Sequence, residues 1–288
     1  MKIKFLFILF LGCALSLTGQ AQSTENALFW KVSGNGLTAD SYLYGTIHLA
    51  CEVKIFDNVK QAFDSTEQLA LEINMADPNM MTVMMQNMYM KDGKKLSDFA
   101  NDEELKQLEA FFKGKVQGMN FGMMQSIKPF FLSAMAVTSF MSCSTPQGYD
   151  MYFMEQAKAK EKSIIGLETL MDQVNMIDKI PYQEQVDELL EMASKPAEEN
   201  SRVYQEMLRR YEAKDLDGLM KFMTEQESSM NLYAEDFLDN RNKKWIPVIE
   251  EKAKETSTFF AFGAAHLAGN NGVINLLRRA GYTIKAME

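Results

Sequence analysis

Histidine is scarce in this chain, with two residues among 288. Runs of lysine and arginine are missing as well, and the formal net charge is −9, so a surface that binds nucleic acid or an anionic membrane is not expected. After residue 21, no stretch approaches the roughly 20 apolar residues that a membrane span needs. We therefore expect a water-soluble body that binds a peptide or a small molecule, of unknown oligomeric state.

The first 21 residues have the pattern of a secretory signal peptide. Lys2 and Lys4 precede an apolar run at 5–17, and the small residues Gly19 and Ala21 flank a cleavage site. Removal of this segment would change the net charge from −9 to −11 and leave 22–288 as a single domain. The predicted location is periplasmic or extracellular, with a lipoprotein anchored at Cys13 as the alternative.

Cysteine is also rare, since only Cys51 and Cys143 remain after residue 21. An exported chain can oxidise such a pair to a disulfide. Two separate buried thiols, which pack as small apolar groups, remain the alternative.

The order of the expected elements indicates an α/β fold. Both ends of the chain contribute strands to a central mixed sheet flanked by helices, and a large helical insertion interrupts it. A helix is expected to open with Asp77 as its cap and Pro78 as its first residue. The expected strands are 28–32, 42–47, 68–73, 163–168, 258–263 and 282–286, and the other expected helices are 102–113, 128–142, 149–160, 182–193, 197–213, 215–226, 247–255 and 272–280.

Methionine is plentiful and forms one stripe at helical spacing, namely Met80, Met81, Met84, Met85 and Met88. Such a stripe can indicate copper binding or a promiscuous groove. Because no histidine or cysteine accompanies it, we interpret it as a flexible core face.

The two histidines share one six-residue frame, Gly-x-x-His-Leu-Ala. His48 follows the strand expected at 42–47, and His266 follows the strand at 258–263. Ligands of open α/β sheets bind at the carboxyl ends of strands, so the two imidazoles are expected to meet in one pocket. The glycine three residues before each histidine allows a close approach that a Cβ would block. Two buried histidines satisfied by backbone carbonyls are the alternative.

Two carboxylates and one guanidinium are further candidates for the site. Glu72 and Glu168 each end an apolar strand, where a buried carboxylate needs a metal, an imidazolium or an arginine as partner. Arg241 is the most suggestive cation, because arginine can clamp a carboxylate or stabilise an oxyanion. Solvated strand ends and a surface arginine are the structural alternatives.

Several segments of the chain together match a known family pattern. They are Phe29-Trp30-Lys31-Val32-Ser33, Tyr42-Leu43-Tyr44-Gly45-Thr46-Ile47-His48, Gly166-Leu167-Glu168-Thr169, Arg241-Asn242 and Gly263-Ala264-Ala265-His266-Leu267-Ala268-Gly269. On these segments the chain resembles the TraB/GumN family, which includes the Tiki proteins. The resemblance spans nearly the whole expected mature chain, and the C-terminal block through Gly281-Tyr282 is its most specific part. It implies an α/β fold shared with erythromycin-esterase-like and ChaN-like proteins, with a site at His48, Glu72 and His266, and with Glu168 and Arg241 as weaker additions.

Three functions follow from this site. The leading hypothesis is a peptidase-like hydrolase in which His48, His266 and Glu72 bind a divalent metal, which could be Mn, Co or Zn, with Glu72, Glu168 and Arg241 as catalytic groups. In the second, a histidine acts as general base without a metal, as in an esterase-type hydrolase. The third is a protein that binds a peptide or haem without turning it over, which the ChaN-like resemblance allows.

Overall fold

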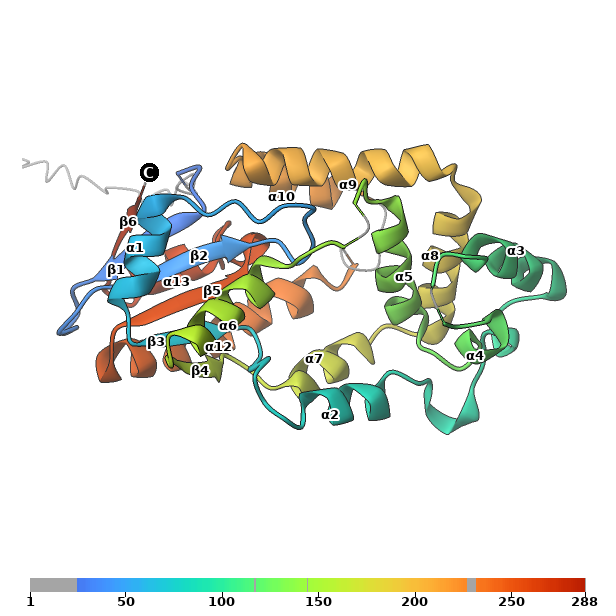
Figure 1. Ribbon diagram of the computed structural model, residues 1–288, viewed down its shortest axis with the longest axis horizontal. Helices are drawn as coiled ribbons and strands as arrows, with labels where there is room; N and C mark the ends of the chain where they lie inside the picture. The colour runs from blue at the N-terminus through green and yellow to red at the C-terminus, as the bar shows by residue number, and fades with distance from the viewer. Residues whose placement is uncertain (1–24, 117, 144, 227–231, 288) are drawn as a thin grey trace, which may run out of the picture.

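Six strands form one mixed sheet at one end of the molecule, as the computed structural model in Figure 1 shows; it describes residues 25–116, 118–143, 145–226 and 232–287. The strand order is β4-β3-β5-β2-β1-β6. The first four of these are mutually parallel, and β1 lies antiparallel between β2 and β6. Their bounds are β1 Phe29–Ser33, β2 Ser41–Thr46, β3 Gln68–Leu71, β4 Ser163–Gly166, β5 Thr258–Gly263 and β6 Thr283–Ala286.

The predicted fold class is confirmed, because strands from both ends of the chain meet in this sheet. β5 pairs with β2 on one side and with β3 on the other, and its residues from Thr258 to Phe262 are buried. A parallel strand covered on both faces reads as a continuous apolar run, as Phe259-Phe260-Ala261-Phe262 does.

Helices cover both faces of the sheet (Figure 1). Phe63 of α1 (Asp57–Ser65) and Phe153 of α6 (Tyr149–Ala159) pack against Phe259. Trp245 of α12 (Asn240–Glu255) packs against Phe262, whose side chain points to the opposite face because strand side chains alternate. α13 (Val273–Arg279) lies beside α12 and leads into β6.

The helical insertion has a hydrophobic cluster of its own at the other end of the molecule (Figure 1). Leu108 of α3 (Asp102–Phe112), Leu132 of α5 (Pro129–Val137) and Leu189 of α8 (Tyr182–Ser194) are fully buried in it. The remaining helices are α2 Met80–Asn87, α4 Phe121–Met124, α7 Leu170–Ile177, α9 Ala197–Glu212 and α10 Leu216–Glu225, with short 3₁₀ or π turns at Lys91–Gly93, Leu96–Asp98, Thr138–Phe140, Glu235–Asp239 and Ala264–His266.

Two predictions about the segment around α2 are wrong in part: Asp77 as the cap of the helix, and the methionine stripe as a core face. Residues 77–79 form a turn in which the Asn79 N–H donates to the Asp77 carboxylate, so α2 begins at Met80. Met81 and Met85 are 65% and 49% exposed, because α2 buries none of its residues and packs mainly along α7. Only Met88, just beyond the helix, joins the buried cluster.

Four α-helical stretches were not predicted: α1, α4, α7 and the first turns of α12. The expected helix 247–255 begins at Asn240 instead, and Pro247 lies inside it. A proline there removes one backbone hydrogen bond without ending the helix. The correction matters for function, because Arg241 lies in the added turns.

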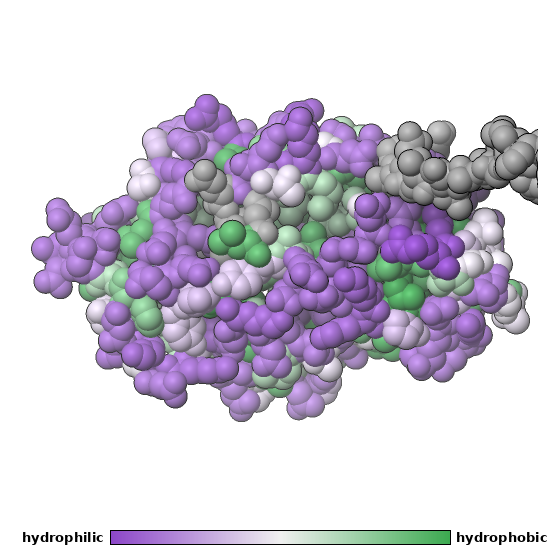
Figure 2. Space-filling model, turned by 180° about the vertical axis from the view of Figure 1, so that it is seen from behind, coloured by the Kyte–Doolittle hydropathy of each residue, from purple (hydrophilic) through white to green (hydrophobic). Residues whose placement is uncertain are grey.

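Within the described residues, no helix is long and apolar enough to cross a membrane. The surface seen in Figure 2 is mainly hydrophilic, with small separate apolar patches. The predicted signal peptide at 1–21, including Cys13, lies outside the described residues.

Candidate functional site

The two Gly-x-x-His-Leu-Ala motifs lie side by side because β2 and β5 are parallel neighbours. In the register of this pair, Thr46 is opposite Gly263. A Cβ added to Gly45 would lie 2.7 Å from the side chain of Leu267 and 3.0 Å from the backbone of Ala264. Glycine is therefore required for the first motif to pack directly on the second.

The histidines of the two motifs converge near Gly263. A Cβ built on this glycine would lie 3.8 Å from His48 Nε2, 3.7 Å from His266 Cδ2 and 3.2 Å from Glu72 Oε1. The Gly263 N–H donates to Glu72 Oε1 over 2.8 Å. The structure thus brings His48, Glu72 and His266 together, while their chemical roles stay predictions.

His48 is the more open of the two imidazoles. Its Nδ1 lies 2.9 Å from Asp150 Oδ2, and the other oxygen of Asp150 accepts a 2.8 Å hydrogen bond from the Thr46 hydroxyl. Desolvation lowers the pKa of His48, but the hydrogen bond and charge of Asp150, aided by the charge of Glu72, outweigh it and raise the pKa from 6.5 to about 9. The side chain is still 68% exposed, so water reaches the ring and screens part of this attraction.

His266 is buried, with 5% of its side chain exposed. Its Nδ1 lies 2.6 Å from Asn242 Oδ1, whose amide nitrogen donates to the carbonyl of Asn271. Nδ1 therefore carries the proton, and Nε2 is left to accept from Arg241 Nη1 at 3.0 Å. Burial lowers the pKa of His266 to about 3, more than the charge of Glu72 raises it, so the ring is neutral.

Arg241 joins the two predicted carboxylates into one buried ionic network. Its Nη2 donates to Glu72 Oε2 over 2.5 Å and to Glu168 Oε1 over 2.6 Å, and all three side chains are largely buried. Arg241 also lies over the ring of Trp245, whose indole N–H donates to Glu168 over 3.2 Å. The structural alternatives, solvated strand ends and a surface arginine, are therefore wrong.

Glu72 is held as a carboxylate. Burial raises its pKa, but the positive charges of Arg241 and His48, together with the Gly263 N–H, outweigh burial and hold the pKa below its ordinary value. Gln173 of α7 adds hydrogen bonds to Glu72 over 3.3 Å and to Glu168 over 3.0 Å.

Four residues of the site were not predicted from the sequence: Asp150, Gln173, Asn242 and Trp245. α7 begins with a capping box between Thr169 and Asp172, which is a sequence signal that could have located Gln173. Asn242 and Trp245 lie in the helical turns missed before Pro247. No local signal marks Asp150, which reaches His48 only through the tertiary fold.

Two of the predicted site residues, His48 and Glu72, line an open cavity of about 660 Å³ together with Asp150 and Gln173. Glu168, Arg241 and His266 lie behind this wall and do not line the cavity. A second cavity of about 230 Å³ is lined by Tyr44, Tyr149 and Tyr211 and contains neither histidine. Of these two cavities, the larger one is therefore the one that His48 and Glu72 face.

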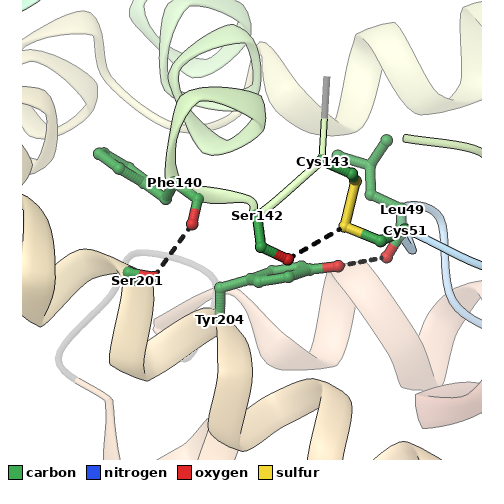
Figure 3. Close-up of a disulfide and its surroundings, with 7 residues drawn as sticks. All are labelled: Leu49, Cys51, Phe140, Ser142, Cys143, Ser201 and Tyr204. Atoms are coloured by element: carbon green, nitrogen blue, oxygen red, sulfur yellow. Dashed lines mark hydrogen bonds between the residues drawn. A yellow bond between two sulfur atoms is a disulfide. The ribbon is translucent and has the colours of Figure 1, made fainter. Parts of the chain in front are cut away.

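A disulfide between Cys51 and Cys143 fixes the loop that leaves His48 (Figure 3). The alternative of two separate thiols is therefore wrong. The hydroxyl of Tyr204 on α9 donates to the carbonyl of Leu49 over 2.8 Å, and Ser142 Oγ lies 3.6 Å from Cys51 Sγ. The bond ties the first motif to the segment that leads into α6 and Asp150.

Residues 28–286 match the TraB/PrgY/gumN family. The chain belongs to this family. Among the curated relatives of this TraB/PrgY/gumN protein, Metalloprotease TIKI1 of Danio rerio is 22% identical over 95% of the chain and 65% of the relative. Metalloprotease TIKI2 of Xenopus tropicalis is 21% identical over 92% of the chain and 61% of the relative, and Metalloprotease TIKI1 of Homo sapiens is 21% identical over 92% and 62%. The chain thus spans less than two thirds of the length of these relatives, and no solved structure matches it significantly.

These relatives are named metalloproteases, and the site has some of the donors that a metal needs. Two imidazoles and a carboxylate are donors that Zn, Mn and Co accept, and polar partners hold both Nδ1 atoms, as around many metal-binding histidines. Among the described residues, however, no three histidine, cysteine or acidic side chains surround a common point. Arg241 also donates to His266 Nε2, the atom that a metal would need. The donor types fit a metal, but their arrangement does not.

Proposed function

We propose that this protein is an exported hydrolase that cleaves amide bonds of peptides at the site of His48, Glu72, Glu168, Arg241 and His266. The observation that carries the proposal is the convergence of two anchored imidazoles and an Arg–carboxylate network behind one open cavity, which His48 and Glu72 line. The names of the curated relatives support the peptidase class. The Cys51–Cys143 disulfide supports an oxidising compartment outside the cytoplasm.

His48 is the group best suited to exchange protons with a substrate. Asp150 holds its Nδ1, and its ring is open to the cavity, so Nε2 can take a proton from a water that attacks the amide carbon. The same atom can then return the proton to the leaving nitrogen. Because the pKa of His48 is raised to about 9, the basic form grows as the pH rises toward that value.

Arg241 is suited to stabilise negative charge. Its guanidinium is held by Glu72 and Glu168 and contacts the neutral His266, so it is fixed in position before any substrate binds. A preorganised cation of this kind can stabilise the oxyanion that forms when water adds to a carbonyl.

A metal-dependent form of the reaction remains the second candidate, because the curated relatives are named metalloproteases. His48, His266 and Glu72 are its proposed ligands, and Mn, Co and Zn its proposed ions. For such a site to form, Arg241 has to leave His266 Nε2.

The test combines peptide cleavage, detected by mass spectrometry, with elemental analysis of the purified protein. We expect cleavage of a mixed peptide library by the wild type and its loss in His48→Ala and His266→Ala. Activity that a chelator leaves unchanged supports the metal-free form, and activity that the chelator abolishes and Mn²⁺, Co²⁺ or Zn²⁺ restores supports the metal form.

Two outcomes would overturn the hydrolase proposal. One is retention of peptides or haem by the wild type without any turnover, which is the behaviour of a binding protein. The other is turnover that persists when either histidine is replaced, which would show that hydrolysis does not occur at the proposed site.

A further inference from the structure

The cavity beside His48 has two chemically different parts. His48, Glu72, Asp150 and Gln173 supply polar groups, and most of the remaining wall is apolar. The apolar residues of the wall, named here the apolar subsite, are Leu49, Leu71, Ile73, Met75, Pro146 and Met151. The cavity volume, about 660 Å³, lies within the range of about 300–1,000 Å³ that is usual for sites binding small ligands.

The charges that line the cavity already have partners. Glu72 is paired with Arg241, which it shares with Glu168, and Asp150 is bonded to His48 and to the Thr46 hydroxyl. Gln147, a neutral residue of the same wall, exchanges two backbone hydrogen bonds with Ala50. A charged substrate side chain would therefore lose its hydration in the apolar subsite without gaining an ionic partner there.

Methionines form the adaptable part of this wall. Met75 lies in the loop after β3, and Met151 lies in the first turn of α6, directly after Asp150. Met151 is exposed, so a ligand in the cavity would cover apolar surface that now meets water. An unbranched thioether side chain can pack against apolar groups of several shapes.

We propose that the apolar subsite receives a large apolar side chain of the substrate peptide, such as leucine, methionine or phenylalanine, next to the bond that is cleaved. This inference rests on the proposed peptidase function and adds its substrate class. The subsite is continuous with His48 and Glu72 in one cavity, which places a bound side chain beside the reacting groups. Burial of the side chain supplies binding free energy, and the paired charges of the wall supply selectivity against Asp, Glu, Lys and Arg.

The first experiment measures kcat/KM for peptides from the cleaved library, resynthesised with a single varied residue beside the cleaved bond. We expect the wild type to prefer Leu or Phe over Asp at that position by about tenfold or more, the scale of discrimination by an apolar pocket. Met151→Lys and Met75→Lys are expected to reduce cleavage of the Leu peptide and to narrow or reverse its advantage over the Asp peptide. Met123→Lys is the matched control, since Met123 is an exposed methionine of α4 outside the cavity, and it should keep the wild-type preference.

A binding experiment separates this inference from the proposed function. Fluorescence anisotropy of labelled peptides on His48→Ala, with Leu or Asp at the varied position, reports on the apolar subsite without turnover. Selective binding of the Leu peptide by a protein that cleaves nothing would overturn the hydrolase but keep the apolar subsite. Equal binding and equal cleavage of both peptides, or an unchanged preference in Met151→Lys and Met75→Lys, would overturn the apolar subsite.

Discussion

Two histidines in identical sequence frames have opposite properties. The His48 Nδ1–H donates to the carboxylate of Asp150, whose charge raises the pKa of this water-exposed ring. His266 donates to a neutral amide and is buried beside Arg241, so its pKa falls. The repeated motif therefore gives one residue that can exchange protons and one neutral residue that fixes the arginine.

The titration of the two rings can be followed directly, because the protein has only two histidines. We expect the His48 NMR signals to titrate well above 6.5, towards about 9, while His266 stays neutral at pH values above about 3. Asp150→Asn should bring the midpoint of His48 down towards its ordinary value. Because folding raises the pKa of His48, protonation of this ring adds to the free energy of unfolding. The contribution is complete below pH 6.5 and is lost as the pH rises through about 9. A His48 midpoint at or below 6.5 would contradict the assignment.

Arg241 is expected to be the residue of the site on which stability depends most. Arg241→Ala leaves Glu72 and Glu168 buried without their cation, so the free energy of unfolding should fall by about 3–5 kcal/mol, as for other broken buried pairs. Urea unfolding measures the change. Arg209→Ala, which removes an arginine bonded to Glu206 on the surface of α9, is the matched control and should have little effect. An equal fall in the free energy of unfolding of the two variants would show that the buried network contributes no more to stability than a surface ion pair does.

At the scale of elements, three segments hold the first histidine in place. β2 delivers the loop, α6 supplies Asp150 and α9 supplies Tyr204, whose hydroxyl bonds the carbonyl of Leu49. The disulfide closes the connection between this loop and the chain before α6. The position of His48 thus depends on tertiary contacts more than on its own loop.

Removal of the disulfide should therefore affect both stability and the first histidine. The bond joins residues 92 positions apart, and we expect Cys51→Ala with Cys143→Ala to lower the free energy of unfolding by about 2–4 kcal/mol. The NMR signals of His48 should shift, and those of His266 should not, since His266 lies on the other motif. Urea unfolding and the histidine spectra, with the reduced wild type as a second comparison, test this. Unchanged His48 signals would show that Tyr204 and Asp150 suffice.

The sequence predicted elements well where the pattern is local. The Phe-rich run of β5 and the turn glycines between β1 and β2 located their strands within one residue. Arg241, Asn242 and Trp245 were placed poorly, because Pro247 falls inside α12 and the polar turns before it carry little apolar periodicity. The partner of His48 could not be predicted at all, since Asp150 is an ordinary acidic residue of a helix first turn until α6 packs on the sheet.

On the scale of the whole molecule, the described residues form two hydrophobic clusters. One lies around the sheet and includes Leu43 and Phe259, and the other lies in the helical insertion and includes Leu108 and Leu132. The candidate site belongs to the first cluster, because its residues follow strands or lie in helices that pack on them. Single-domain organisation of 22–288 stays a prediction.

Hydrogen exchange can show whether the two clusters open independently. Leu108→Ala creates a cavity at a fully buried position of the insertion, so it should lower the free energy of unfolding by about 2–5 kcal/mol. It should raise the rate of hydrogen exchange mainly in α3, α5 and α8. Leu43→Ala in β2 is the matched variant and should raise exchange in the sheet. A uniform increase over the whole chain in both variants would show that the two clusters unfold as one unit.

The central position of β5 sets the order in which the site can be assembled. β2 and β3 come early in the chain, but they are not neighbours in the sheet until β5 enters between them. A chain that emerges from the ribosome with its N-terminus first therefore has His48 and Glu72 long before Arg241 and His266 join them. The proposed site is complete only when almost the whole chain is available, so an unfinished chain lacks the groups that the proposed reaction needs.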